Sequence, residues 1–358
     1  MWSEIFRALP MKQNLKKVYI FSTSRYSHMR WLCAELKQSG SEEKVYLNYF
    51  AGYSMDTELL QCKAILRADL SELPTDDRLL AAVRQLPKCQ HLRAFGMRID
   101  SDHMRLSLAL AEFLRSATAL HTLDLRIRGG GSQQAQGQNP WWNVILDSIS
   151  RSKSVEKLSL VMSGMSIQDS QNLADSVKKN TYIRELRFEN TPQANNTAFF
   201  RRLSRGIEDN YTLSTVECWD GLDADGVSDW LAVKETVWRN AGLVPRAARI
   251  KQASQSDRYV TGAVERVARY PALLDAVARS AKLDRAELAV LVRDRLLATK
   301  SKNGFMRFVG VVKERVICHP TDDGRMQLDD LDEDCWSHVR RYLFTDDVKI
   351  DVVQGDSA

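Results

Sequence analysis

Cysteine and histidine are the residues of this chain that could act as nucleophiles, bases or metal ligands, and their spacing decides whether they can do so. The six cysteines lie 29, 27, 129, 100 and 17 residues apart, which leaves no Cys-x-x-Cys pair and no Cys/His pair at zinc-ligand spacing. The six histidines are scattered, and no His-Glu-x-x-His or Gly-x-Ser-x-Gly motif is present. We therefore expect a non-enzymatic protein with no cofactor and no metal, whose thiols are reduced and buried. An enzyme is the least favoured alternative.

The composition is that of an ordinary globular protein, with 44% apolar and 27% charged residues. The longest apolar runs, such as Leu288 to Val292, are about five residues long, whereas a membrane-spanning helix needs roughly 18. The first residues contain no apolar core of signal-peptide length. We therefore expect a soluble protein of the cytoplasm that does not enter a membrane.

The net charge of +5 is distributed unevenly along the chain. Residues 1–241 carry 31 basic and 28 acidic groups, residues 242–320 carry 16 and 7, and residues 321–358 carry 4 and 11. A basic segment of this kind can attract nucleic acid, an anionic lipid surface or an acidic protein. Because an acidic tail follows it directly, we favour that tail as its partner and do not expect nucleic-acid binding.

A short apolar pattern recurs down the middle of the chain. The strands that it predicts would position the polar side chains that alternate with the apolar ones. Its apolar residues stand at positions 1, 4 and 6 of five segments, whose first positions are 28, 35, 28 and 30 residues apart, with amphipathic helical stretches between them. The five segments are Leu92-x-x-Phe95-x-Met97, Leu120-x-x-Leu123-x-Leu125, Val155-x-x-Leu158-x-Leu160, Ile183-x-x-Leu186-x-Phe188 and Leu213-x-x-Val216-x-Cys218. Less regular segments precede them at Leu15-x-x-Val18-x-Ile20, at Val45-x-Leu47 and near Ala64 to Leu66. A strand followed by a helix and a parallel strand cannot bury its apolar face alone, so these units must stack into a solenoid.

A small or polar residue stands three positions before each segment, where a helix must end and turn into the next strand. With Asn-x-x-Ile at Asn180 and Asn-x-x-Leu at Asn210, the 28-residue spacing resembles the ribonuclease-inhibitor type of leucine-rich repeat, over about residues 15 to 240. That type includes the leucine-rich-repeat region of NOD-like receptor family proteins. The resemblance implies an α/β fold, a horseshoe-shaped solenoid with a parallel sheet and convex helices. It also implies a protein-binding role as a recognition module or scaffold, innate-immune-sensor-like by analogy. The Gly-x-x-x-x-Gly-Lys-[Ser/Thr] phosphate loop of a full NOD-like receptor is absent.

Strand alternation decides which side chains leave the core and point into the concave face of such a sheet. Tyrosine, tryptophan and arginine are enriched among residues that dominate binding energy. We therefore predict a concave binding face, for a protein ligand whose identity the sequence does not reveal, made of Tyr19, Phe21, Tyr46, Arg98, Arg126, Arg128, Arg187, Glu217 and Trp219. Tyr19 and Tyr46 occupy the same column, so their rings should form an aromatic strip that either binds the ligand or only stabilises the array. The glycine-rich stretch from Gly129 to Gln138 is expected to be a tolerated insertion.

The repeat pattern stops near Ala241, which predicts three regions. These are a leucine-rich-repeat solenoid over residues 1–240, a basic helical region over 241–320, and an acidic C-terminal helix and tail over 321–358. The C-terminal region should be all-helical, and the apolar spacing predicts helices at Pro245–Ala253, Tyr259–Tyr270, Pro271–Ala281, Asp284–Ala298 and Phe305–Ile317.

The acidic C-terminal region contains one amphipathic stretch, from Leu328 to Leu343. Its apolar positions that could share one helical face are Leu331, Trp336, Val339, Tyr342 and Leu343. The stretch is similar to the opening helix of an F-box, which docks a ubiquitin-ligase adaptor, although the usual proline is absent. As the alternative function, we therefore consider a substrate receptor of a ubiquitin ligase whose adaptor binds these five residues.

Overall fold

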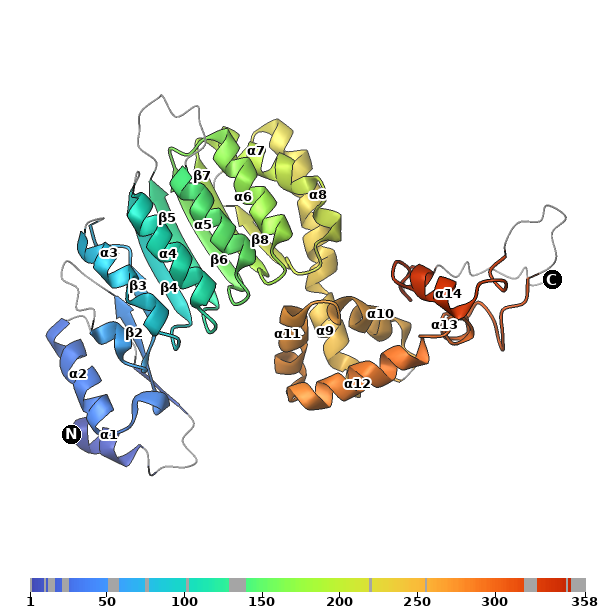
Figure 1. Cartoon of the computed structure of the whole chain (residues 1–358), viewed down its shortest axis with the longest axis horizontal. Coiled ribbons are helices and arrows are strands. Elements are labelled where there is room, and N and C mark those ends of the chain that lie inside the picture. The colour runs from blue at the N-terminus through green and yellow to red at the C-terminus, as the bar shows by residue number, and fades with distance from the viewer. Residues whose placement is uncertain are drawn as a thin grey trace. The chain divides into compact units, whose positions relative to one another are not determined.

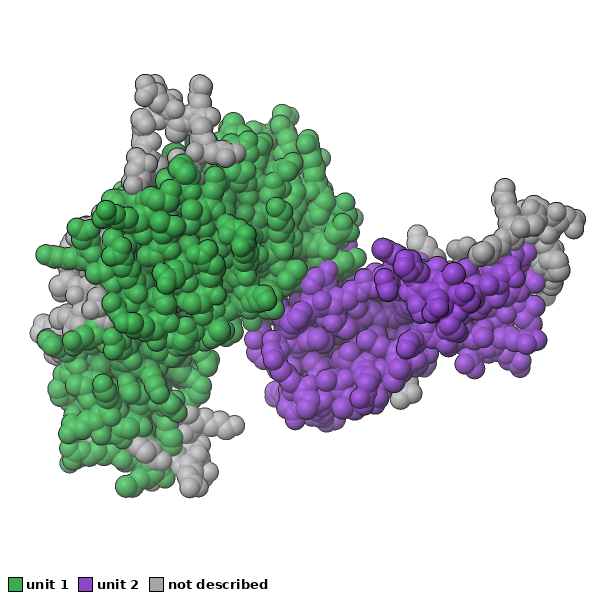
Figure 2. Space-filling view, viewed as in Figure 1, with its two compact units in different colours: residues 1–237 green, residues 238–358 purple. Residues whose placement is uncertain are grey.

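The structure is a computed structural model in which residues 2–9, 11, 17–20, 26–50, 58–74, 77–100, 103–128, 140–218, 221–254, 256–318, 327–345 and 347–348 are described. The chain divides into two compact units (Figure 2). We call residues 1–237 the repeat unit and residues 238–358 the helical unit, and each is described by itself.

The repeat unit is built on one eight-stranded sheet in which every strand pairs in parallel with its sequence neighbour. The strands are β1 (Val18–Ile20), β2 (Val45–Phe50), β3 (Ile65–Leu70), β4 (Ala94–Asp100), β5 (Thr122–Arg128), β6 (Lys157–Ser163), β7 (Glu185–Thr191) and β8 (Thr215–Cys218). Because neighbours in the sheet are also neighbours in sequence, the chain advances by one strand per repeat, as a solenoid requires.

Helices connect successive strands and lie over one side of the sheet, where α4 to α7 run side by side (Figure 1). The α-helices are α1 (Trp2–Ala8), α2 (Tyr26–Gln38), α3 (Asp77–Val83), α4 (Met104–Ser116), α5 (Pro140–Arg151), α6 (Ile167–Lys179), α7 (Gln193–Ser204) and α8 (Ala224–Ala241). Shorter 3-10 helices are η1 (Glu42–Lys44), η2 (Leu59–Gln61), η3 (Leu86–Lys88) and η4 (Ile207–Asp209).

The core of the repeat unit lies between the sheet and these helices. Leu123 and Leu125 of β5 are fully buried, and Leu123 pairs in register with Phe95 on β4 and Leu158 on β6. Positions 4 and 6 of the five regular segments therefore line up across the sheet, as their spacing predicts. The repeat unit has a leucine-rich-repeat-like α/β fold.

Asn180 and Asn210 hold the turns that lead into β7 and β8. The Asn180 side-chain oxygen accepts hydrogen bonds from the backbone N–H groups of Tyr182 (2.7 Å) and Ile183 (2.8 Å). Its amide donates to the carbonyls of Ile149 (2.7 Å) and Ser152 (3.0 Å), which end the preceding rung. Asn210 repeats the arrangement one rung later. A buried amide thus satisfies backbone groups of two adjacent rungs at once.

Strands β1 and β2 begin at Val18 and Val45, where two of the less regular segments predict them, whereas the third segment was placed imprecisely. The segment expected near Ala64 to Leu66 is in fact β3, whose buried residues are Ile65, Ala68 and Leu70. The pairing of β2 with β3 contains a register shift between Leu47 and Asn48. Residue Leu15 and the insertion from Gly129 to Gln138 lie outside the described residues.

The helical unit contains further short helices, and one of its buried clusters joins Phe305, Met306, Val309 and Trp336. The helices are α9 (Leu243–Ala247), η5 (Ala248–Lys251), α10 (Arg258–Val267), α11 (Pro271–Ala281), α12 (Arg285–Ala298), α13 (Lys302–Phe308) and α14 (Glu333–Arg340). The helix expected over Phe305–Ile317 is wrong in extent, because α13 ends at Phe308. Gly310 adopts a φ of +79°, a left-handed conformation that glycine enters without steric cost, and the helix does not continue through it.

A buried carboxylate ties the C-terminal segment to the rest of the helical unit. Glu265 on α10 is 6% exposed. It accepts hydrogen bonds from the hydroxyl of Thr299 (3.3 Å), from Arg340, and from both the N–H (2.9 Å) and the hydroxyl (3.1 Å) of Thr345. A second ion pair joins Arg266 to Asp347 at 3.1 Å. Acidic and basic segments therefore do contact each other, although the best-buried pair has its acid in the basic segment.

Candidate functional site

One side of the sheet is not covered by the helices of the repeat unit, which lie on the other side (Figure 1). Along β5 the side chains of Leu123, Leu125 and Ile127 are buried, whereas Arg126 and Arg128 are exposed. Strands β6 and β7 alternate in the same way. We call the uncovered side, formed by the alternate residues of β1 to β8, the sheet face. It displays the side chains that strand alternation predicts.

At the N-terminal end of the sheet face, Tyr19 and Tyr46 stand opposite each other on β1 and β2. Their ring centroids are 4.8 Å apart and their planes are tilted by 42°. The ammonium group of Lys17 lies 4.3 Å from the centroid of the Tyr46 ring, within cation–π range. The predicted contact between the tyrosines is present, and Tyr19 remains 61% exposed. Phe21 lies outside the described residues.

At the C-terminal end of the sheet, the predicted charged residues neutralise each other. The guanidinium of Arg187 on β7 lies 3.0 Å from the carboxylate of Glu217 on β8, its direct partner in register. One column away, Lys157 and Glu185 form a second pair at 2.8 Å. Exposed pairs like these contribute little stability, but they leave this part of the face electrically balanced. Trp219 lies outside the described residues.

Three arginines gather in the middle of the sheet face. Arg98 on β4 is the register partner of Arg126 on β5, and Arg128 follows on the same strand. They border a hollow of about 550 Å³ whose other lining residues are Ser71, Glu72, Ile127, Val161 and Ser163. We call Arg98, Arg126 and Arg128 the arginine edge.

The charges of the arginine edge are only partly compensated. Arg98 Nε lies 3.4 Å from Asp100, and this buried nitrogen has no hydrogen bond within the described ranges. Neither Arg126 nor Arg128 forms an ion pair with any carboxylate of the described chain segments. Guanidinium groups with free donors can bind a carboxylate in a bidentate manner.

Two aspartates adjoin the arginine edge. Asp69 on β3 and Asp124 on β5 flank Gly96 on β4. A Cβ atom at Gly96 would approach the Asp69 carboxylate oxygen to 3.1 Å, so glycine leaves the space that this side chain occupies. Burial raises the pKa of Asp124, with a smaller contribution from Asp69, while Arg126 acts in the opposite direction. The sheet face therefore offers cations and anions side by side.

The five residues considered as an adaptor-binding face do not lie on one exposed surface. Trp336 is fully buried against Phe305, with ring centroids 5.5 Å apart, and its indole N–H donates to the Lys300 carbonyl at 3.0 Å. Val339 and Tyr342 are exposed. The remaining two, Leu331 and Leu343, are half-buried. Helix α14 spans only Glu333–Arg340, so Leu331, Tyr342 and Leu343 lie outside it, and Trp336 packs inward.

Sequence reasoning did not include Arg67, Asp69 or Glu72 in the site. Arg67 and Asp69 alternate along β3 toward the sheet face, and placing that strand at Ile65–Leu70 would have identified both. Glu72 follows the strand in a turn, where no periodicity applies.

The thiols differ in their surroundings. Cys33, Cys62 and Cys89 are buried, and burial raises the pKa of Cys89 to about 11. Cys335 is exposed, which corrects the expectation that all six are buried. Over the described part of the chain, no three His, Cys, Asp or Glu side chains are grouped so that they could hold a metal ion. None of the described helices combines the length and the apolar character needed to span a membrane.

Comparison with known proteins gives structural similarities alone. No protein-family model matches the chain, and no curated protein does. Among solved structures, the chain is similar to a structure titled leiomodin-1 actin-binding site 2, with 15% identity and a TM-score of 0.35, covering 50% of this chain and 96% of that one. It is also similar to the tropomodulin C-terminal domain of Caenorhabditis elegans, with 13% identity and a TM-score of 0.35, covering 47% of this chain and 95% of that one.

Proposed function

We propose that this chain is a non-enzymatic recognition module that binds an acidic segment of a partner protein on its sheet face, at the arginine edge. The observation that carries the proposal is the contrast in charge along the face. Lys157 and Arg187 each form an ion pair with a carboxylate of the next strand. Arg126 and Arg128 border an open hollow and form no ion pair among the described residues, although Glu72 lines the hollow and Asp100 is the register partner of Arg128.

The chemistry of the hollow favours carboxylates of a polypeptide. Hydrogen bonds to a charged group are worth roughly 1.5 to 3 kcal/mol each, and arginine can make two to one carboxylate. The short side chain of Ser163 and the apolar Val161 on β6 leave room for such a group beside the guanidinium groups. Asp69 and Asp124 on the same face would repel the continuous phosphate charge of a nucleic acid, so a protein segment with few, spaced acids is the better match.

We also propose which type of leucine-rich repeat the chain contains. The 28-residue spacing and the buried side chains of Asn180 and Asn210 support a ribonuclease-inhibitor type of repeat, as in the NOD-like receptor family. An innate-immune-sensor-like role would follow from that analogy alone. We further propose that the protein works in the cytoplasm, since three of its cysteines are buried thiols. No observation favours the ubiquitin-ligase alternative, because Trp336 is in the core.

The experiment is affinity capture of partners by the full chain, followed by mass spectrometry. The test variant is Arg126→Glu/Arg128→Glu. The control variant, Lys153→Glu/Lys179→Glu, makes the same change in net charge at two exposed lysines outside the sheet face. Lys153 follows helix α5, and Lys179 is the last residue of α6. Captured partners are then measured one by one, by biolayer interferometry, against all three proteins.

We expect a partner that binds the wild type and the control equally and loses about tenfold or more in affinity with the arginine variant. Its binding should also weaken as salt is raised. Partners that bind all three proteins alike would refute the arginine edge as the site. Ubiquitin-ligase adaptors among partners that depend on Val339 and Tyr342 would favour the alternative instead.

A further inference from the structure

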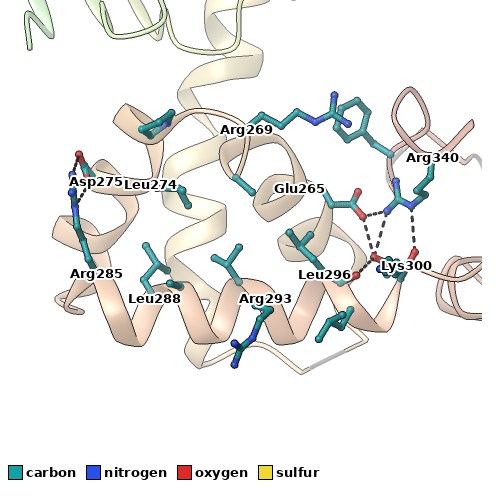
Figure 3. Close-up of a pocket in the computed structure, with 17 residues that line it drawn as sticks. Glu265, Arg269, Leu274, Asp275, Arg285, Leu288, Arg293, Leu296, Lys300 and Arg340 are labelled. Carbon is teal, nitrogen blue, oxygen red and sulfur yellow. Dashed lines mark hydrogen bonds and ion pairs between the residues drawn. The ribbon is translucent and has the colours of Figure 1, made fainter. Parts of the chain in front are cut away.

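The helical unit contains a groove that the sheet face does not involve. Its volume is about 790 Å³, inside the range of roughly 300 to 1,000 Å³ typical of binding sites. Helix α12 forms one wall, and α10, α11 and the loop between them form the other (Figure 3). In Figure 3 Leu288 projects from α12 toward Leu274 on α11, and Leu296 projects toward the side of Glu265.

The floor of the groove is apolar and partly open to solvent. Leu288 and Val292 are buried, Leu274 and Leu296 are half-buried, and Leu297 is 56% exposed. Leu288 and Leu296 are eight residues apart on one face of α12, so the floor is about 12 Å long at 1.5 Å per residue. A partner helix that presents apolar residues at i, i+4 and i+7 covers roughly 10 Å, so the two lengths match.

Charges stand at both ends of this floor. At one end Arg285 donates to both carboxylate oxygens of Asp275, which balances the pair. The other end carries an excess of positive charge from Arg269, Lys300 and Arg340.

Of the two carboxylates that line the groove within the described residues, Asp275 stands at the other end, and Glu265 at the basic end already accepts a hydrogen bond from Arg340. Arg269 donates to the Arg341 carbonyl at 2.7 Å and stacks on Phe344, but it forms no ion pair among the described residues. Lys300 also forms none there. Arg293 extends away from the leucines in Figure 3 and does not add to this end. The groove is therefore apolar along its length and basic at one end.

We propose that this groove binds an acidic amphipathic helix of a partner protein. Three apolar side chains of that helix pack against Leu274, Val292 and Leu296, and its carboxylates face Lys300 and Arg269. A helix fits better than a fatty acid, because the exposed Leu297 leaves one side of the groove in water. A helix keeps its polar face there, whereas an acyl chain has no polar face and would remain exposed.

The test uses a display library of helical peptides of about 12 residues, a little over three turns. Three positions at i, i+4 and i+7 are fixed as leucine, and the others are drawn equally from Glu, Lys, Gln and Ala. The full chain is the bait. The groove variant is Leu297→Asp/Lys300→Glu. The matched control is Val290→Asp/Lys313→Glu, which changes an exposed apolar residue of α12 and an exposed lysine that do not line the groove.

We expect selection to enrich peptides rich in Glu. A synthetic peptide from that pool should lose about tenfold or more in affinity with the groove variant and less than about twofold with the control, by fluorescence polarisation. Circular dichroism of both variants establishes that they fold. Enriched peptides without an excess of Glu, or peptides that bind the groove variant as well as the wild type, would overturn the proposal. The proposal would also be overturned if no acidic peptide is enriched and the fluorescent fatty acid cis-parinarate binds the wild type and the control but not the groove variant.

Discussion

Asn180→Ala tests whether the buried amides hold the repeats together. The Asn180 side chain is 1% exposed and makes four short hydrogen bonds to backbone groups of two rungs. Truncation removes the partner of the Tyr182 and Ile183 N–H groups and of the Ser152 carbonyl. The Ile149 carbonyl keeps a second donor, the N–H of Ser152 at 3.2 Å.

The expected cost follows from these three orphaned groups. A buried donor or acceptor that loses its partner costs about 1 to 3 kcal/mol. The site of Tyr182 is half-buried, so water recovers part of the loss there. We therefore expect the free energy of unfolding of the repeat unit to fall by ~3 to 5 kcal/mol. For a unit of this size the melting temperature should fall by about 10 °C.

The assay is urea unfolding of the full chain, followed by far-ultraviolet circular dichroism, with wild type and variant compared by midpoint and slope. Asn172→Ala is the control, because Asn172 lies on α6 of the same repeat. Its side chain forms hydrogen bonds with the side chains of Gln168 and Asn143, and these bonds are exposed or partly buried. It should change the free energy of unfolding by less than about 1 kcal/mol. A loss at Asn180 no larger than the loss at Asn172 would refute the reasoning that buried amides join the rungs.

Three further predictions concern the core and the sheet face. Leu158→Ala and Leu186→Ala should each lower the free energy of unfolding by ~2 to 5 kcal/mol, since both leucines are buried in the continuous core; urea titration measures this, and little change would contradict the strand faces assigned here. Tyr19→Ser/Tyr46→Ser should weaken partner binding by more than ~1 kcal/mol if the aromatic contact is a hot spot, whereas unchanged affinity with a lower melting temperature would make it structural. Asp124→Asn should raise stability near neutral pH. The pKa of the Asp124 carboxyl is raised by burial, so the folded state favours its protonated form, and the stability this contributes is lost as pH rises through that raised pKa. Melting curves at several pH values should show the two proteins converging below the ordinary aspartate pKa of about 3.9.

The spacing of apolar residues was sufficient to predict the regular strands and their register. Leu123 and Leu158 stand at position 4 of their segments and pair directly, because each repeat adds one parallel strand beside the strand of the previous repeat. The bounds of strand β3 could not be predicted precisely, because the residue at its position 4 is Ala68. Alanine is fully buried there, but its small side chain gives a weak apolar signal in the sequence.

The site was predictable only in part. Alternation placed Arg98 and Arg126 on the sheet face, and the register then brings them together. The hollow beside them depends on the short side chain of Ser163 two strands from Arg98, which no periodicity indicates. Likewise, the spacing put Trp336 on an apolar helical face, but tertiary packing against Phe305 decides that this face is inside.

The hydrogen bonds of Glu265 make residues 340–345 a condition for a stable helical unit. Most of its partner groups belong to Arg340 and Thr345, close to the last described residues. A polypeptide that ends before Arg340 leaves the Glu265 carboxylate with the hydrogen bond from Thr299. Each hydrogen bond to a charged group contributes roughly 1.5 to 3 kcal/mol, so losing those from Arg340 and Thr345 removes a large share of the stability of a small domain. Quality-control proteases would thus distinguish a chain that contains residues 340–345 from one that lacks them. Limited proteolysis of a chain ending at Val339 should show rapid cleavage within residues 243–308, and resistance equal to that of the full chain would contradict this consequence.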